Sequence, residues 1–383
     1  MIADLWPWLV LIRAPGLGPV RCARLLAHFN EPAAIIGASH AELAAHGAPR
    51  AAIEYLHRPN AAELDADLAW LAQPGRALVS VHDPAYPRQL YATGCAPVAL
   101  FVHGDVRLLS EPQLAIVGTR NPTPTGLRIA EDFARELTQS GLVITSGLAL
   151  GIDAAAHEGA LNTPGSTIAV LGTGLDRIYP ARHRDLAHRV VERGALVSEF
   201  PLGIPVRAAH FPQRNRLISG LTLGTLVIEA ARQSGSLITA RLATEQGREV
   251  FAVPGSIRNP AAQGCHWLIR QGAKLVENVN DIMEELTPQL RRFVDAAPAP
   301  DRQPDITASV PVSPQTADRH SILNAEQKAL LAYLDDEPIA VDSLVERTGL
   351  TVDVVSSMLL ILELHGCIQV VPGGRYRRAS IDD

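Results

Sequence analysis

The run LAIVGTRNPTPTG, at Leu114–Gly126, joins an apolar stretch to a helix-like stretch through a glycine, a threonine and an arginine. Five more apolar runs follow it, and helix-like segments separate them. Strands that are apolar along their whole length and alternate with helices are typical of a parallel sheet covered on both faces. The sequence therefore predicts an α/β fold with a doubly wound, Rossmann-like parallel sheet.

The expected strands are Leu114–Gly118, Leu142–Gly147, Thr167–Gly172, Ala195–Glu199, Thr225–Ala230 and Glu249–Gly255, with Leu78–Val81 as a further strand before them. The expected helices of this domain are Gly126–Ser140, Asp153–Leu161, Arg182–Arg193, Gln213–Ser219, Leu237–Gln246 and Gly264–Gln271.

Short polar motifs stand where strands meet helices: VGTR (Val117–Arg120), SGLALGIDAAAH (Ser146–His157), FPQRNR (Phe211–Arg216) and SGSLITA (Ser234–Ala240). Because the carboxyl ends of parallel strands meet at one edge of a sheet, we expect these motifs to converge. Glycine allows close backbone approach, helix N-termini attract anions, and arginine binds phosphate with two donors. The sequence therefore predicts a cleft for several phosphates, as in a polynucleotide or a nucleotide-derived ligand.

Two patterns bear on chemistry. A dinucleotide-binding domain would carry G-x-G-x-x-G after its first strand, so the sequence disfavours NAD, and we expect no cofactor. Asp153 and His157 are four residues apart on one helix face and could form a general-base pair. We favour the other interpretation, a helix-start aspartate bonded to backbone and a histidine filling a polar pocket, because no nucleophile stands beside them.

Composition narrows the class of protein. The net charge of −6, taken alone, argues against binding to nucleic acid. The charge is unevenly distributed, however: residues 111–292 hold 19 Lys+Arg and 17 Asp+Glu, whereas residues 324–383 hold 5 Lys+Arg and 10 Asp+Glu. No run of about 18 apolar residues occurs, so we expect no membrane span. The first residues lack a basic region and carry Asp4, so we expect no signal peptide. The four cysteines lack metal-ligand spacing, and we expect no metal site.

The outer segments differ from the core at 76–294. Residues 1–75 are alanine-rich and helix-like, and Ala14–Phe29 resembles a helix-hairpin-helix in which the Gly16–Gly18 turn would face a phosphate; a plain helical turn is the alternative. Residues 295–320 hold five prolines and predict a linker. Residues 321–383 predict a winged helix, with helices at 324–334, 341–348 and 351–365 and a hairpin turning at Pro372–Gly374.

Residues 77–290 resemble the DNA-processing protein A family, also called DprA or Smf. The resemblance rests on the motifs above, on FPQRNRLISGL (Phe211–Leu221), on TIAVLGTGLDRIYP (Thr167–Pro180) and on VFAVPGSI (Val250–Ile257), in this order and spacing. It implies a cytoplasmic homodimer without catalytic activity. Such a protein binds single-stranded DNA, protects incoming strands and loads the recombinase RecA on them in natural transformation.

The resemblance also implies a set of DNA-binding residues: Arg120, Gly147, Arg182, Arg214, Arg216, Ser234, Gly235 and Ser236. The motifs themselves add Gly118, Thr119, Ser146, Asn215 and Thr239 to the residues that we expect to bind DNA. Three positions depart from the family pattern. Thr119 replaces a common serine, and His183 and His266 replace asparagines; the change at His266 puts a contact by that position in doubt.

Two other functions remain as alternatives. Phosphoribohydrolases that cleave nucleoside monophosphates use a related sheet, but their PGGxGT signature is absent and Glu229 stands outside that context. A transcription factor acting through the winged helix would need cations on its recognition helix. The helix expected at 351–365 has Asp353 and Glu363 but no lysine or arginine.

Overall fold

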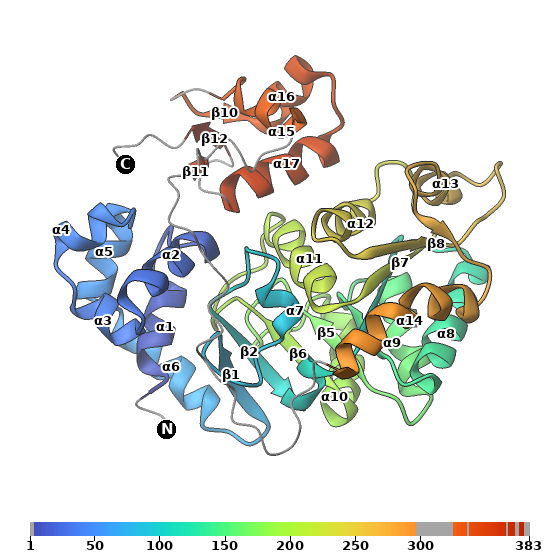
Figure 1. Cartoon of the computed structure of the whole chain (residues 1–383), viewed down its shortest axis with the longest axis horizontal. Coiled ribbons are helices and arrows are strands. Elements are labelled where there is room, and N and C mark those ends of the chain that lie inside the picture. Colours follow the sequence, from blue (N-terminus) through green and yellow to red (C-terminus); the bar gives the residue numbers. More distant parts are fainter. Residues whose placement is uncertain (1–3, 296–324, 335–336, 365–366, 372–374, 379–383) are drawn as a thin grey trace.

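The computed structural model describes residues 4–295, 325–334, 337–364, 367–371 and 375–378. Its centre is a nine-stranded sheet in the order β1-β2-β6-β5-β4-β3-β7-β8-β9 (Figure 1). The strands are β1 (Arg76–Ser80), β2 (Ala99–Gly104), β3 (Gln113–Gly118), β4 (Val143–Ser146), β5 (Thr167–Val170), β6 (Ala195–Ser198), β7 (Gly224–Ile228), β8 (Glu249–Ala252) and β9 (Lys274–Leu275).

The sheet is mostly parallel. All pairs from β6 through β3 to β9 are parallel, whereas β2 pairs antiparallel with both β1 and β6. The six strands expected after residue 113 and the earlier strand at Leu78–Val81 are confirmed, with ends shifted by a few residues. The sequence analysis missed β2 and β9, because β2 follows a proline-rich connector and β9 has only two residues.

Helices cover both faces of the sheet. Alternate residues of β3 separate the faces: Leu114 and Ile116 pack in one apolar cluster, and Ala115 and Val117 in another. The first face carries α8 (Pro124–Gln139), α9 (Ile152–Leu161), α10 (Arg184–Arg193) and α14 (Val279–Asp295). The second carries α7 (Arg88–Tyr91), α11 (His210–Leu221), α12 (Ser236–Glu245) and α13 (Gln263–Arg270). This is the predicted doubly wound arrangement, although α7 and α14 were not predicted.

The strand order creates a crevice at β3. The chain runs from β3 outward through β4 and β5 to β6, and then returns to place β7 on the other side of β3. Because the helices after β3 and β7 lie on opposite faces, the loops at the carboxyl ends of these two strands diverge. Ligands of open α/β sheets bind at such a reversal point.

The N-terminal part forms six helices: α1 (Trp6–Arg13), α2 (Pro19–Phe29), α3 (Pro32–Gly37), α4 (His40–Ala45), α5 (Arg50–His57) and α6 (Ala61–Leu71). The turn between α1 and α2 has Gly16 at φ +73°, which favours glycine. These helices share one apolar cluster with the sheet, since Trp70 packs with Phe101 and Leu196. The expected boundary at residues 75 and 76 therefore crosses a common core.

The C-terminal part is a winged helix with its own apolar core, which includes Leu334, Leu344 and Met358. Its elements are α15 (Ala325–Leu331), β10 (Ile339–Ala340), α16 (Val341–Thr348), α17 (Val352–Leu364), β11 (Ile368–Val371) and β12 (Arg375–Arg378). The three helices and the hairpin strands are as predicted, and β10 adds a third strand. The expected linker beyond Asp295 and the turn at Pro372–Gly374 lie outside the described residues.

Within the described ranges, every helix is too short or too polar to cross a membrane. Three of the four cysteines are buried, and burial raises the pKa of Cys265 to about 11.

Candidate nucleic-acid interface

A cleft of ≈ 740 Å³ opens at the carboxyl ends of β3 and β7, between the start of α9 on one side and α11 and α12 on the other; it is called the β3–β7 cleft below. Nine of the residues expected to bind DNA line it: Gly118, Thr119, Arg120, Arg214, Asn215, Ser234, Gly235, Ser236 and Thr239. These nine residues come from three separate motifs, and the fourth motif adds Ala149 and Asp153 to the lining, so the motifs meet in one place as the parallel topology predicts.

The loop after β3 presents Arg120 to this cleft. Two hydrogen bonds hold the backbone of Thr119 in place. Its N–H donates to the Glu229 carbonyl at 2.7 Å, and its carbonyl accepts from the Ile152 N–H at 3.2 Å. Arg120 is exposed, and its guanidinium carbon lies 5.7 Å from the centre of the Phe211 ring. Among the described residues no carboxylate forms an ion pair with Arg120. Its N–H groups can therefore donate to a bound anion.

Arg214 forms the inner wall of the cleft. Its side chain is 4% exposed, and one Nη donates to the Gly147 carbonyl at 2.6 Å and to the Val170 carbonyl. Burial lowers the pKa of Arg214 to about 10, although the nearby Asp153 opposes this shift. A Cβ at Gly147 would lie 2.5 Å from this guanidinium, so glycine is needed there because the arginine crosses its backbone.

Asp153 and His157 form hydrogen bonds with different partners. Asp153 Oδ2 accepts from the N–H groups of Gly147 at 3.0 Å and Ala149 at 3.3 Å, and burial raises its pKa against the effect of Arg214 and these N–H groups. The His157 Nδ1 instead lies 2.7 Å from Thr167 Oγ1, inside the core. The favoured interpretation, a backbone-bonded aspartate and a core histidine, is confirmed.

The start of α12 forms another wall. Ser234 and Ser236 hydroxyls lie 2.7 Å apart, and Gly235 is the residue just before the helix. Thr239 is 1% exposed, although it borders the cleft. Backbone N–H groups and hydroxyls at the first turn of a helix stabilise a bound anion.

The sequence analysis missed two aromatic residues of the cleft. The rings of Tyr179 and Phe211 lie 5.5 Å apart at an angle of 44°, and Tyr179 is 45% exposed. Together with Arg120 they form a row of flat groups. The available signal was the position of each ring beside an already noted motif, Tyr179 before Arg182 and Phe211 before Arg214. Only the fold brings the two rings together.

Four of the expected residues lie outside the cleft lining: Ser146, Gly147, Arg182 and Arg216. Arg216 is the clearest correction, because it is fully buried, pairs with Glu199 and donates to the Cys95 carbonyl at 2.6 Å. Ser146 is buried and donates to the Ile116 carbonyl at 2.6 Å. Gly147 acts by making room for Arg214, and Arg182 is exposed on the short helix Ala181–His183.

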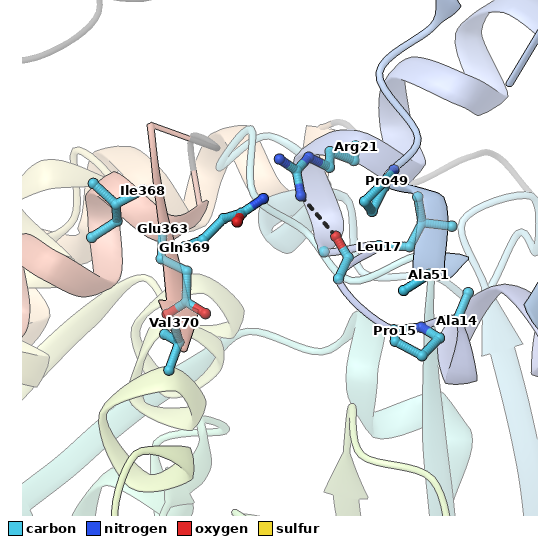
Figure 2. A pocket seen from close by; sticks show the side chains of 12 residues that line it. Ala14, Pro15, Leu17, Arg21, Pro49, Ala51, Glu363, Ile368, Gln369 and Val370 are labelled. Atoms are coloured by element: carbon cyan, nitrogen blue, oxygen red, sulfur yellow. Dashed lines mark hydrogen bonds between the residues drawn. The ribbon is translucent and has the colours of Figure 1, made fainter. Parts of the chain in front are cut away.

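The helical hairpin turn lines a different cleft of ≈ 510 Å³, shared with the winged helix. Figure 2 shows Leu17 and Arg21 on one wall and Glu363, Gln369 and Val370 on the other. Arg21 donates to the Gly16 carbonyl at 3.0 Å. The hairpin turn therefore shares its cleft with the Glu363 carboxylate, and the Arg21 side chain is hydrogen-bonded to the turn itself.

Comparison with known proteins places this geometry in a family. The family model described as DNA recombination-mediator protein A matches residues 77–287, and the DprA winged helix domain matches residues 312–374. Protein Smf of Escherichia coli K12 is 47% identical over 323 residues, which cover 82% of each chain.

Two solved structures resemble the chain. The DNA processing protein A of Streptococcus pneumoniae has a TM-score of 0.65 at 37% identity and covers 73% of this chain and 97% of its own. The DNA processing protein A of Helicobacter pylori, solved for its single-stranded DNA binding mode, has a TM-score of 0.50 at 30% identity. The match covers 55% of this chain and 96% of the H. pylori chain.

Proposed function

The chain belongs to the DNA recombination-mediator protein A family, and from this premise we propose that it binds single-stranded DNA in the β3–β7 cleft. The observation that carries the proposal is the convergence of Arg120, Arg214 and the start of α12 beside the rings of Tyr179 and Phe211. Cations hold the phosphate backbone, and aromatic rings stack on bases of any sequence.

The proposal favours single strands over duplex DNA for a geometric reason. Bases in a duplex are stacked on one another and cannot stack on a ring that lines a cleft, whereas the bases of a single strand can turn toward it. The H. pylori relative, solved for its single-stranded DNA binding mode, supports the same preference.

We further propose that the protein acts as a homodimer in the cytoplasm, protects incoming strands and loads RecA on them during natural transformation and homologous recombination. The family description, a recombination mediator, supports this role. The role requires binding and transfer of a strand rather than bond cleavage, so we propose no catalytic activity.

Binding is tested with labelled single-stranded and duplex oligonucleotides of one sequence at several salt concentrations. We expect tighter binding of the single strand, with an affinity that falls linearly on a log–log plot against salt. Equal affinity for the duplex would contradict the proposed mode of binding.

The finer role has separate measurements. The full chain should shorten the lag of RecA filament formation on strands coated with single-strand-binding protein, and sedimentation should give twice the chain mass. Incubation with nucleoside monophosphates and Mg²⁺ should release no base. Base release that disappears in Glu229→Ala would instead favour the phosphoribohydrolase alternative.

A further inference from the structure

A second, smaller cleft lies beside the first on the same edge of the sheet. It has a volume of ≈ 330 Å³ and opens at the carboxyl ends of β7 and β8. The loop after β3 passes from one cleft to the other, because Thr119 and Arg120 line the β3–β7 cleft and Thr123 and Thr125 line the smaller one. A strand held in the first cleft can therefore continue into the second. This inference rests on the proposed function.

Glu229 is held in the smaller cleft by unusual geometry. Its backbone has φ +49°, a region that residues other than glycine seldom adopt, which is typical of functional sites. Its carboxylate accepts from the Thr123 N–H at 2.7 Å and from the Thr123 hydroxyl at 2.5 Å. A Cβ at Gly126 would lie 2.5 Å from this carboxylate, so glycine at that position makes the room.

The carboxylate keeps capacity to bind a ligand. A carboxylate has about four acceptor positions, and Thr123 uses two of them. Glu229 is only half-buried and borders the cavity. The remaining acceptor positions suit a ligand that presents two adjacent N–H donors.

The lining of the same cleft also holds side chains with hydrogen-bond donors. The side-chain oxygen of Asn259 accepts from the Ala261 N–H at 3.0 Å. In the described part of the chain, the side-chain amide N–H groups of Asn259 have no partner. Ser256 Oγ accepts from the Arg258 N–H at 3.3 Å, which leaves its hydroxyl proton as a donor. Apolar wall atoms come from Val253 and Pro254.

We propose that this cleft binds one nucleobase of the strand held in the β3–β7 cleft, and that it prefers guanine. Guanine presents N1–H and the 2-amino group side by side, which can both donate to Glu229, and its O6 can accept from Asn259 or Ser256. Adenine and cytosine offer one amino donor beside a ring nitrogen acceptor, which would face a carboxylate oxygen. Thymine offers one N–H between two carbonyls.

The residues at the mouth fit a strand that enters from solvent. Ile257 is 84% exposed, although it is apolar, and it can cover the face of a base. Arg258 beside it is exposed and can pair with the adjoining phosphate. Phosphate itself would be repelled by Glu229, so the cavity interior suits a base rather than the backbone.

The test is a competition assay with the full chain and a labelled oligothymidine. Competitors of the same length carry isolated dG, deoxyinosine, dA or dC in place of thymidine, and spacing the dG residues avoids guanine quadruplexes. We expect the dG competitor to displace the label about fivefold better than the oligothymidine, as for one bidentate contact to a base. Deoxyinosine, which lacks the 2-amino group, should be intermediate, and dA and dC should match thymidine.

Glu229→Gln should remove the preference for dG over thymidine, whereas Glu192→Gln, at an exposed residue of α10, should keep both this preference and the affinity for oligothymidine. Should Glu229→Gln fail to fold, the comparison of dG with deoxyinosine on the natural chain decides. Equal competition by all strands overturns the guanine site while single-strand binding stands. Failure to bind any oligonucleotide overturns both this inference and the proposed function.

Discussion

Arg120 and Arg216 lie in two regions of the same domain that use the same kinds of residue in opposite ways. Arg120 is exposed in the β3–β7 cleft and lies over an aromatic ring, whereas Arg216 is a buried residue of α11 and pairs with Glu199. Both come from motifs that resemble phosphate sites. The location of the partner separates them, because an arginine whose charge is compensated inside the protein has little left for a ligand.

The same division applies to the polar residues around them. Asp153 Oδ2 accepts hydrogen bonds from two backbone N–H groups, and the His157 ring forms a hydrogen bond with Thr167. His157 lies in the core behind the cleft, whereas Asp153 borders the cleft with one of its carboxylate oxygens bonded to the backbone. The comparison predicts that substitutions in the interior change stability and that substitutions in the cleft change binding.

The largest expected effect belongs to the interior. Arg216→Ala leaves Glu199 buried without its cation, so the free energy of unfolding should fall by about 3–5 kcal/mol. Single-strand affinity per folded molecule should not change. Chemical denaturation measures the first and a binding titration the second. The double variant Arg216→Met with Glu199→Leu should recover part of the loss. A stable Arg216→Ala protein with weak DNA binding would place Arg216 in the interface.

The next effect concerns pH. Burial lowers the pKa of His157 to about 3, so below the ordinary histidine pKa of about 6.5 the unfolded chain takes up a proton that the native protein does not. Stability should therefore fall as the pH drops, and this histidine should contribute about 2 kcal/mol of loss at about pH 5.

Denaturation of the natural chain and of His157→Gln at about pH 7.5 and about pH 5 checks this contribution. The variant should lose less stability between the two, whereas His188→Gln, at an exposed histidine on α10, should behave as the natural chain does. An identical pH response in His157→Gln would show that the histidine is not held neutral.

A smaller effect is expected in the cleft. Arg120→Ala removes one charged contact to phosphate, so single-strand affinity should fall about tenfold, and the salt dependence should decrease by roughly one unit of slope. The melting temperature should stay constant because Arg120 has no partner carboxylate among the described residues. Arg270→Ala, at an exposed arginine on α13, is the matched control. An unchanged salt slope in Arg120→Ala would exclude a phosphate contact.

The smallest effect is expected from the winged helix. Residues 321–383 carry a net charge of −5, and three of their cations, Arg375, Arg377 and Arg378, lie together on β12. Because this part has its own apolar core, it can be prepared alone, and it should bind duplex DNA only weakly at physiological salt. Tight duplex binding lost on replacing these three arginines by alanine would make the winged helix a main DNA contact.

Local sequence patterns were enough to predict most strands of the sheet, most of the helices that cover it and the edge where its polar loops meet. Apolar runs that end in glycine identify buried parallel strands, because the periodicity of burial is a local property of the chain. The winged helix followed from the same kind of pattern. The short strand β9 and the connector strand β2 carried too little of this signal.

The tertiary structure alone decided which motif residues face the ligand. Arg214 and Arg216 are two residues apart in one helix. No local pattern shows that Arg214 borders the cleft while Arg216 pairs with Glu199 at the end of β6. Tyr179 and Phe211 become one platform, and Glu229 meets Thr123, only when the chain folds. A side chain's role depends on partners distant in sequence, because ion pairs, hydrogen bonds and burial are set by positions in space.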